Sequence, residues 1–188
     1  MEGTVAARPV AELIRDVAAR LGPQRFSEVC VSLLLGADRE DHLEVLPWLT
    51  GHSWAPGEAV RDRAVWKDHW LRTWGARGLL HVWDDAATEA VVAGLADDDW
   101  RPAEMCLKVV ARHEVAGAGD GAATLADHPL PRVRVAAMRA LAAVGDTEHA
   151  EVVAAGRHDP DADVRRAADR AWEALSMRLD LPEERLAD

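Results

Sequence analysis

Several residue types are scarce in this 188-residue sequence, and each shortage excludes a class of protein. There are two cysteines, Cys30 and Cys106, too few for the disulfide framework of a small secreted domain. No stretch approaches the roughly 18 consecutive apolar residues that a membrane-spanning helix needs. Residues 1–8 also lack the apolar core of a secretory signal peptide. These shortages predict a cytoplasmic protein whose cysteines are free and act as small hydrophobes.

Basic residues are also in deficit. The 22 lysines and arginines face 33 aspartates and glutamates, which gives a formal net charge of −11. Such a chain is poorly suited to neutralising nucleic-acid phosphates or to docking on anionic lipid. The sequence lacks a glycine-rich phosphate loop, a nucleophile elbow and a paired-cysteine metal motif. We therefore expect no catalytic residue, no cofactor, no metal and no membrane partner, and nucleic acid is disfavoured as a partner.

Tyrosine is absent and phenylalanine occurs once, yet the chain has eight tryptophans. Five of them lie between Trp66 and Trp100. Trp66, Trp70 and Trp74 recur every four residues, a spacing that places all three on one face of a helix. Such a strip either fills the core or stacks against a partner. Large apolar residues at helical spacing usually face inward, which favours the core.

A unit of about 31 residues recurs along the chain. Its copies are the segments Leu71–Val82, Val133–Val144 and the one that opens at Val164. The second residues of these segments are Arg72, Arg134 and Arg165. The interval from Arg72 to Arg134 is twice that from Arg134 to Arg165. A period of this length with two helices per unit predicts an α-solenoid, a stack of helix pairs with a continuous core.

The hydrophobic periodicity predicts helices and no sheet. Expected helices cover 9–21, 26–36, 38–49, 59–82, 88–96, 102–112, 121–126, 132–144, 150–156 and 164–175. Pro47 is expected to distort the third helix, and Trp74-Gly75 to interrupt the fourth. We expect one domain over 1–188, with irregular helices over 1–60, regular repeats over 61–177 and a charged tail over 178–188.

The segment Asp127-His128-Pro129-Leu130-Pro131-Arg132-Val133-Arg134, followed by Gly145-Asp146, resembles a HEAT repeat in its turn and second helix. Asp159-Pro160 with Val164-Arg165 repeats the pattern. The bacterial form of this family is similar to the repeats of phycobiliprotein lyases. The resemblance implies a right-handed superhelix of helix pairs. Most members are scaffolds, and a minority are enzymes, such as DNA glycosylases and metal hydroxylases.

This resemblance frames the expected function. We predict a non-enzymatic scaffold or regulatory adaptor that binds a protein partner on its concave helical surface. The alternative is a HEAT-fold enzyme, with a DNA-base glycosylase ahead of a metal-dependent hydroxylase. Hydroxylases of this fold use several His-Glu pairs to cage two irons, whereas this chain has only His113-Glu114.

The repeated arginines have two interpretations. Arg72, Arg134 and Arg165 could form a row that binds anions. The resemblance instead implies a ladder, in which such arginines and aspartates, here Asp127 and Asp159, bridge successive turns. The ladder is favoured because repeated positions serve the shared scaffold first.

Binding energy concentrates in a few aromatic and arginine anchors, and such residues gather in the middle of this chain. The predicted partner-binding residues are Trp66, Trp70, Trp74, Arg72, Arg101, Glu104 and Lys108. We place the binding centre across 62–82 and 102–112, away from the C-terminal repeats that carry Arg139 and Arg170. A groove lined by Arg72, Arg101, Arg134 and Arg165 would favour nucleic acid, whereas an acidic or mixed groove would favour a protein.

Overall fold

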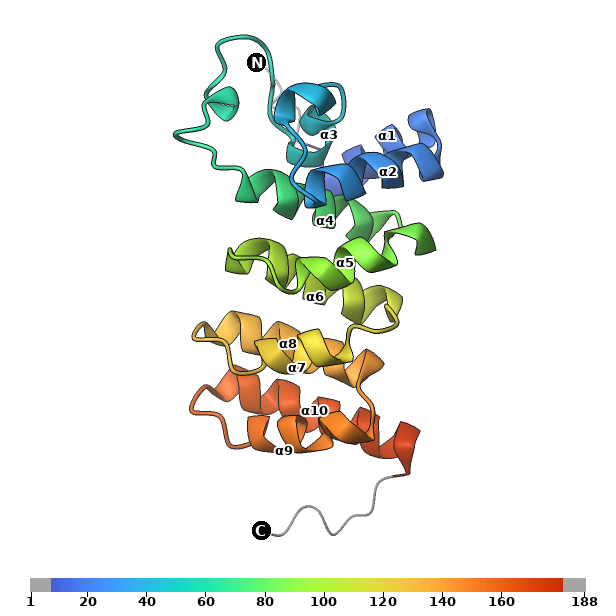
Figure 1. The fold of residues 1–188 in the computed structure, drawn as a ribbon, viewed down its shortest axis with the longest axis vertical. Coiled ribbons are helices and arrows are strands. Elements are labelled where there is room, and N and C mark those ends of the chain that lie inside the picture. Colours follow the sequence, from blue (N-terminus) through green and yellow to red (C-terminus); the bar gives the residue numbers. More distant parts are fainter. Residues whose placement is uncertain (1–7, 181–188) are drawn as a thin grey trace, which may run out of the picture. The chain divides into compact units, whose positions relative to one another are not determined.

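A computed structural model describes residues 8–180 of the chain. These residues form helices joined by turns and loops, with no β-strand among them (Figure 1). They divide into two compact units, the first ending at Ala87 and the second beginning at Thr88. Within 8–180, no helix is both long and apolar enough to cross a bilayer. Most of the tail expected over 178–188 lies outside the described residues.

The first unit is built around the contact between α2 and α4. Its α-helices are α1 (Val10–Leu21), α2 (Pro23–Leu34), α3 (Leu46–Thr50) and α4 (His69–His81). Short 3-10 helices lie between and after them: η1 (Arg39–His42), η2 (Ala59–Arg61) and η3 (Asp85–Ala87). Gly22, with a φ of 86°, ends α1, and Pro23 opens α2 in the first helical turn, where its missing N–H costs nothing.

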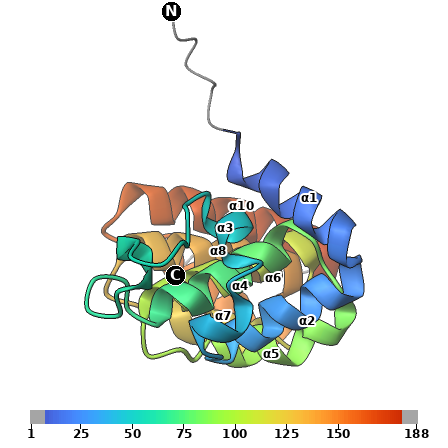
Figure 2. The same ribbon diagram turned by 90° about the horizontal axis from the view of Figure 1, so that it is seen from above.

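Two glycines allow α2 and α4 to lie side by side (Figure 2). A Cβ atom on Gly75 would lie 2.5 Å from the carbonyl oxygen of Cys30, and one on Gly78 would lie 2.3 Å from the Cys30 sulfur. Gly75 was expected to interrupt this helix. That expectation is wrong, because α4 runs unbroken from His69 to His81 and the glycine serves as a packing surface.

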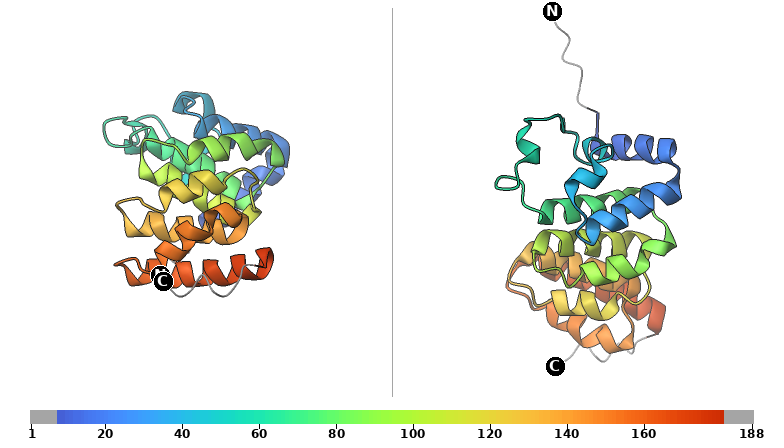
Figure 3. Two further views of the ribbon diagram at one scale, coloured as in Figure 1. Left: turned by 60° about the horizontal axis from the view of Figure 1, so that its bottom comes forward. Right: turned by 45° about the horizontal axis from the view of Figure 1, so that its top comes forward.

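The segment between α3 and α4 departs most from the sequence prediction. A helix was expected over 59–82, but the α-helix begins only at His69, and Figure 3 shows the turquoise segment before it as a wide loop with one 3-10 turn. The helix expected over 38–49 is likewise divided into η1 and α3. Pro47 lies in the first turn of α3, so it helps to start a helix where it was expected to distort one.

One buried side chain holds this loop. Arg39 is only 1% exposed. Its guanidinium donates to the backbone oxygens of Val60 (3.3 Å), Arg61 (3.4 Å) and Trp66 (2.8 Å), and to the Asp68 carboxylate (2.7 Å). A loop needs partners for its backbone carbonyls, and here a planar cation supplies several at once. Arg39 therefore takes the role that helical hydrogen bonds would have had.

The second unit consists of three helix pairs. They are α5 (Thr88–Gly94) with α6 (Trp100–His113), α7 (Gly119–Leu125) with α8 (Pro131–Val144), and α9 (Ala150–Gly156) with α10 (Ala162–Leu179). The helix α8 packs between α6 and α10, and the three pairs form successive layers within this unit in Figure 1. The second helices begin at Trp100, Pro131 and Ala162, at equal intervals that match the period of the sequence.

Alanines occupy buried positions of α8 and α10, which pack against each other. Ala137, Ala140, Ala168 and Ala171 are all fully buried. Small side chains at a helix contact let the backbones approach closely and leave little room for a larger residue.

Candidate functional site

Arg134 and Arg165 serve the scaffold. Arg134 in α8 makes a bidentate ion pair with Asp159 in the turn between α9 and α10, with Nε–Oδ2 at 2.7 Å and Nη2–Oδ1 at 2.8 Å. Its Nη1 also donates to the backbone oxygens of His128 and Pro129. Arg165 repeats this role, since its Nη1 donates to the oxygens of Asp159 and Pro160. The predicted ladder is confirmed for Arg134 and Asp159, and both arginines hold the backbone of a turn.

The ladder also changes the ionisation of its members. Hydrogen bonds from Arg134 hold the pKa of Asp159 below its usual value, and the same pair raises the pKa of Arg134. Both side chains are mostly buried, at 13% and 11% exposed, so water screens the pair only weakly.

The predicted tryptophan strip forms a cluster in the first unit, although it does not lie on one helix. Trp70 and Trp74 belong to α4, whereas Trp66 precedes it, so the expectation that a single helix face carries all three is wrong. The rings nevertheless meet, with Trp66 centred 5.6 Å from Trp70 and 5.5 Å from Trp74. Trp54 joins them edge-on to Trp74 at 5.7 Å. Trp74 is 3% exposed, in agreement with the favoured core interpretation, whereas Trp66 and Trp70 are only half-buried.

A charged groove runs across α6, α8 and α10 in the second unit. It has a volume of about 450 Å³, and we call it the α6–α8–α10 groove. Its lining residues are Glu104, Lys108, Arg132, Val135, Arg139, Asp163, Ala167 and Arg170. Four cations and two carboxylates give it a net charge of +2 (4 − 2), in a chain of net charge −11. The groove is therefore mixed in charge but locally basic.

Glu104 anchors one side of this groove. Its side chain is only 8% exposed, and it lies 2.9 Å from Nη2 of Arg132 and 3.0 Å from Nζ of Lys108. A buried carboxylate is stable only when cations or other donors satisfy its oxygens. Glu104 thus fixes both cations at the groove while they stay partly exposed, Lys108 at 37% and Arg132 at 58%.

Trp100 orients the Arg132 guanidinium from a second direction. The guanidinium carbons of Arg132 and Arg101 each lie 4.6 Å from the centre of the Trp100 ring. A guanidinium stacked on an aromatic ring loses little further freedom when it binds a planar anion. Arg132 is therefore held in place by Trp100 and Glu104 with part of its surface open to solvent.

Three cations of the groove occupy one position of the repeat. Lys108, Arg139 and Arg170 follow one another at intervals of one repeat period, and we call them the cation row. Within residues 8–180, Arg139 has no hydrogen-bond or ion-pair partner, and Arg170 donates only to the backbone oxygen of Arg166 in its own helix. Unlike the Arg134 ladder, most of this row is not used to hold the fold together.

The residues predicted to bind a partner thus fall into two groups. Trp66, Trp70, Trp74 and Arg72 belong to the first unit, where Arg72 is half-buried on α4. Arg101, Glu104 and Lys108 belong to α6 of the second, and the latter two line the groove. Arg132 was not among the predicted residues, and the predicted binding centre excluded the C-terminal repeats. The regular spacing of the cation row is the signal that would have included Arg139 and Arg170.

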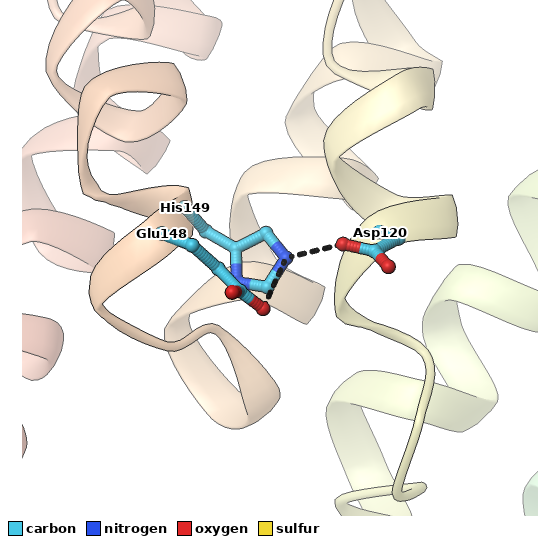
Figure 4. A group of neighbouring side chains, drawn as sticks. All are labelled: Asp120, Glu148 and His149. Atoms are coloured by element: carbon cyan, nitrogen blue, oxygen red, sulfur yellow. Dashed lines mark hydrogen bonds and ion pairs between the residues drawn. The ribbon is translucent and has the colours of Figure 1, made fainter.

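One group of side chains could hold a metal by position, among the residues that the structure describes. Ligand atoms of Asp120, Glu148 and His149 lie within 4.8 Å of one another (Figure 4). However, Nδ1 of His149 accepts from the backbone N–H of Asp146 at 2.9 Å, so the ring proton is on Nε2 and points to Asp120, 3.1 Å away. A metal on Nε2 would need that proton on Nδ1, which the Asp146 amide prevents.

His149 therefore has a structural role as part of a helix cap. The Asp146 side chain caps the turn in return, which completes a reciprocal capping box at η4 (Thr147–His149). This geometry opposes metal binding and supports the prediction of a metal-free protein, which stays a prediction.

The two cysteines offer no reactive thiol. Cys30 and Cys106 are free and fully buried, and burial raises the pKa of each thiol well above its usual value. A thiol in this state is a poor nucleophile at neutral pH. Both act as small apolar residues in their helices, as the sequence analysis expected.

Comparison of the chain with protein families, with curated proteins and with solved structures finds no match. The function must therefore be inferred from the geometry of the chain itself.

Proposed function

We propose that this chain is a non-enzymatic adaptor, a right-handed HEAT-like solenoid that binds a protein partner in the α6–α8–α10 groove. The equal intervals between the starts of α6, α8 and α10 support the repeat architecture. The interval in sequence between the start of α4 at His69 and the start of α6 at Trp100 is also one repeat period. The groove is formed by the second helix of each pair, which is the surface that solenoids commonly use for binding.

The cation row is the observation that supports binding most strongly. A repeat position retained only for stability should be engaged with the scaffold, as Arg134 and Arg165 are. Arg139 instead points its charge at the groove with no partner among the described residues. Exposed arginines beside an oriented indole are typical anchors of protein interfaces.

A protein suits this groove better than nucleic acid does. A groove lined by four arginines would have favoured nucleic acid. Two of these, Arg134 and Arg165, instead form hydrogen bonds within inter-helix turns. The lining of the groove is mixed in charge. A long polyanion would also extend beyond the groove, where a chain of net charge −11 would repel it. We place the adaptor in the cytoplasm, because a reducing compartment suits its two free cysteines.

Capture from the native host with charge-reversed variants tests this function. The full chain is used as bait in three forms: unchanged, with Arg139→Glu and Arg170→Glu, and with Arg15→Glu and Arg25→Glu. The last two substitutions change the net charge by the same amount as the groove substitutions, but they lie at exposed positions of α1 and α2.

We expect a partner that the unchanged and control baits retain equally and that the groove variant loses by about fivefold or more. Quantitative mass spectrometry of the captured proteins gives the ratio. Capture that is equal for all three baits, or no capture by any of them, would contradict the proposal.

A further inference from the structure

We infer that the partner segment in the α6–α8–α10 groove is extended and acidic, with carboxylates about three residues apart. This inference rests on the proposed function and names the chemistry of the partner. It follows from the charge of the groove, from the spacing of its cations and from the state of Glu104.

Charge complementarity identifies the segment as acidic. The groove has a net charge of +2 while the whole chain has −11, so the groove is a basic site on an acidic protein. Arginines pair with carboxylates through two parallel hydrogen bonds, and Arg139 and Arg170 both present exposed guanidiniums. A basic or neutral segment would leave these cations without partners.

The geometry of the row sets the spacing. Successive members of the cation row lie on neighbouring packed helices, whose axes are typically about 8–10 Å apart. A segment in the extended polyproline II conformation advances about 3.1 Å per residue with three residues per turn, so every third side chain returns to the same face and comes level with the next cation.

The floor of the groove fits the same occupant. Between the charged walls it is lined by Val135 and Ala167, which leave room for small side chains between the carboxylates. Asp163 at one wall pairs with Arg166 and so adds little repulsion. A segment with an acidic residue at every third position and small residues between them would thus contact both the charged and the apolar lining residues.

Glu104 acts as an internal competitor of the partner's carboxylates. It already binds Lys108 and Arg132, the two cations at the α6 side of the groove. If an acidic segment binds here, replacing Glu104 by glutamine frees both cations and raises the groove charge from +2 to +3. The variant should therefore bind more tightly, which is the reverse of what loss of an ordinary contact residue does.

Peptide binding to the full chain tests the inference. The probes are a fluorescent 12-residue peptide with glutamate at every third position among Gly and Ser, and one of the same composition with its glutamates in a block. A 12-nucleotide single strand of DNA is the third probe. Anisotropy is measured at low and at high salt with the unchanged chain, Glu104→Gln, Arg139→Glu/Arg170→Glu and Arg15→Glu/Arg25→Glu.

We expect the spaced peptide to bind about threefold more tightly than the block peptide, and to weaken at high salt. Arg139→Glu/Arg170→Glu should weaken it at least about tenfold, the Arg15/Arg25 control less than about twofold, and Glu104→Gln should strengthen it about threefold. Thermal unfolding confirms that each variant is folded.

Equal binding of the spaced peptide to the unchanged chain and the groove variant would overturn the inference. So would tighter, groove-dependent binding of the DNA, which would identify nucleic acid as the occupant. If no acidic peptide binds while a host protein is still captured through Arg139 and Arg170, the inference fails and the proposed function stands. If neither occurs, both fail.

Discussion

The two units solve the same structural problems with different residues. Each needs helices to approach closely, and the first uses Gly75 and Gly78 where the second uses buried alanines such as Ala140. Each needs partners for the carbonyls of its turns, and each uses an arginine. In the second unit this arrangement recurs one repeat period apart, at Arg134 and Arg165, whereas Arg39 of the first unit does not lie at that repeat position. Repetition is what made the second unit predictable.

The largest effect should come from removing Arg39, the buried arginine of the first unit. Arg39→Ala leaves the carbonyls of Val60, Arg61 and Trp66 without their donor and opens a cavity. We expect a loss of about 3 kcal/mol in the free energy of unfolding, measured by urea titration of tryptophan fluorescence. Limited proteolysis should cut first between residues 51 and 68. An unchanged midpoint and unchanged cleavage would show that the loop does not depend on Arg39.

A methyl group at the α2–α4 contact should cost somewhat less. In Gly75→Ala the new Cβ would meet backbone atoms of Cys30 at 2.5 Å and of Leu34 at 2.8 Å, which cannot rotate away. We expect about 2–3 kcal/mol of destabilisation by overpacking, although alanine is the better helix former. Gly57→Ala in the loop is the control, because no atom lies near the added Cβ there. Its own cost arises from the positive φ of Gly57 and not from overpacking. Equal melting of Gly75→Ala and the unchanged protein would refute the close approach.

The alanine contact of the second unit gives the parallel test. Ala140 is fully buried in α8, so Ala140→Phe should overpack the stack and cost roughly 1–3 kcal/mol. Arg139→Phe at the neighbouring exposed position controls for the added aromatic surface. A denaturation midpoint that does not move for Ala140→Phe would show that α8 has another register.

The smallest effect is expected at the Arg134–Asp159 ion pair, because neutralising one charge removes no apolar packing. Asp159→Asn keeps the shape but removes the charge that Arg134 binds, at a cost of about 1–2 kcal/mol at neutral pH. Because the folded pKa of Asp159 lies below its usual 3.8, this stabilisation is complete above that value and is lost as the pH falls through the folded pKa. The gap between the urea midpoints of the two proteins should therefore narrow below about pH 3.8. A constant gap at all pH values would mean that the charge is irrelevant.

The repeat allowed the second unit to be predicted closely. The helix expected over 150–156 is α9 as found, and the buried alanines follow from the apolar stripe. The first unit was predicted poorly before His69, because Trp66 continues the four-residue spacing of Trp70 and Trp74 although it lies outside their helix. Nothing periodic in the sequence marks Arg39, whose partners lie 21 to 29 residues away. A single long-range contact leaves no pattern to detect.

The candidate site was predictable in part for the same reason. Glu104 and Lys108 of α6 were among the residues predicted to bind a partner, and both line the groove. Arg132 was missed because its role depends on Trp100 and Glu104, which belong to the preceding helix pair and meet it only in the fold. Arg139 and Arg170 repeat the position of Lys108, so the period that identified the fold could also have extended the site.

Site-specific photo-crosslinking tests most directly whether the α6–α8–α10 groove is the binding site. A photoreactive amino acid replaces Val135 in the groove, or Glu151 on the exposed surface of α9 as the control, in the full chain expressed in its native host. We expect a discrete adduct with one partner from position 135, none from position 151, and loss of the adduct when Arg139→Glu is added. An adduct from position 135 that survives Arg139→Glu, or one formed equally from position 151, would show that the partner binds elsewhere.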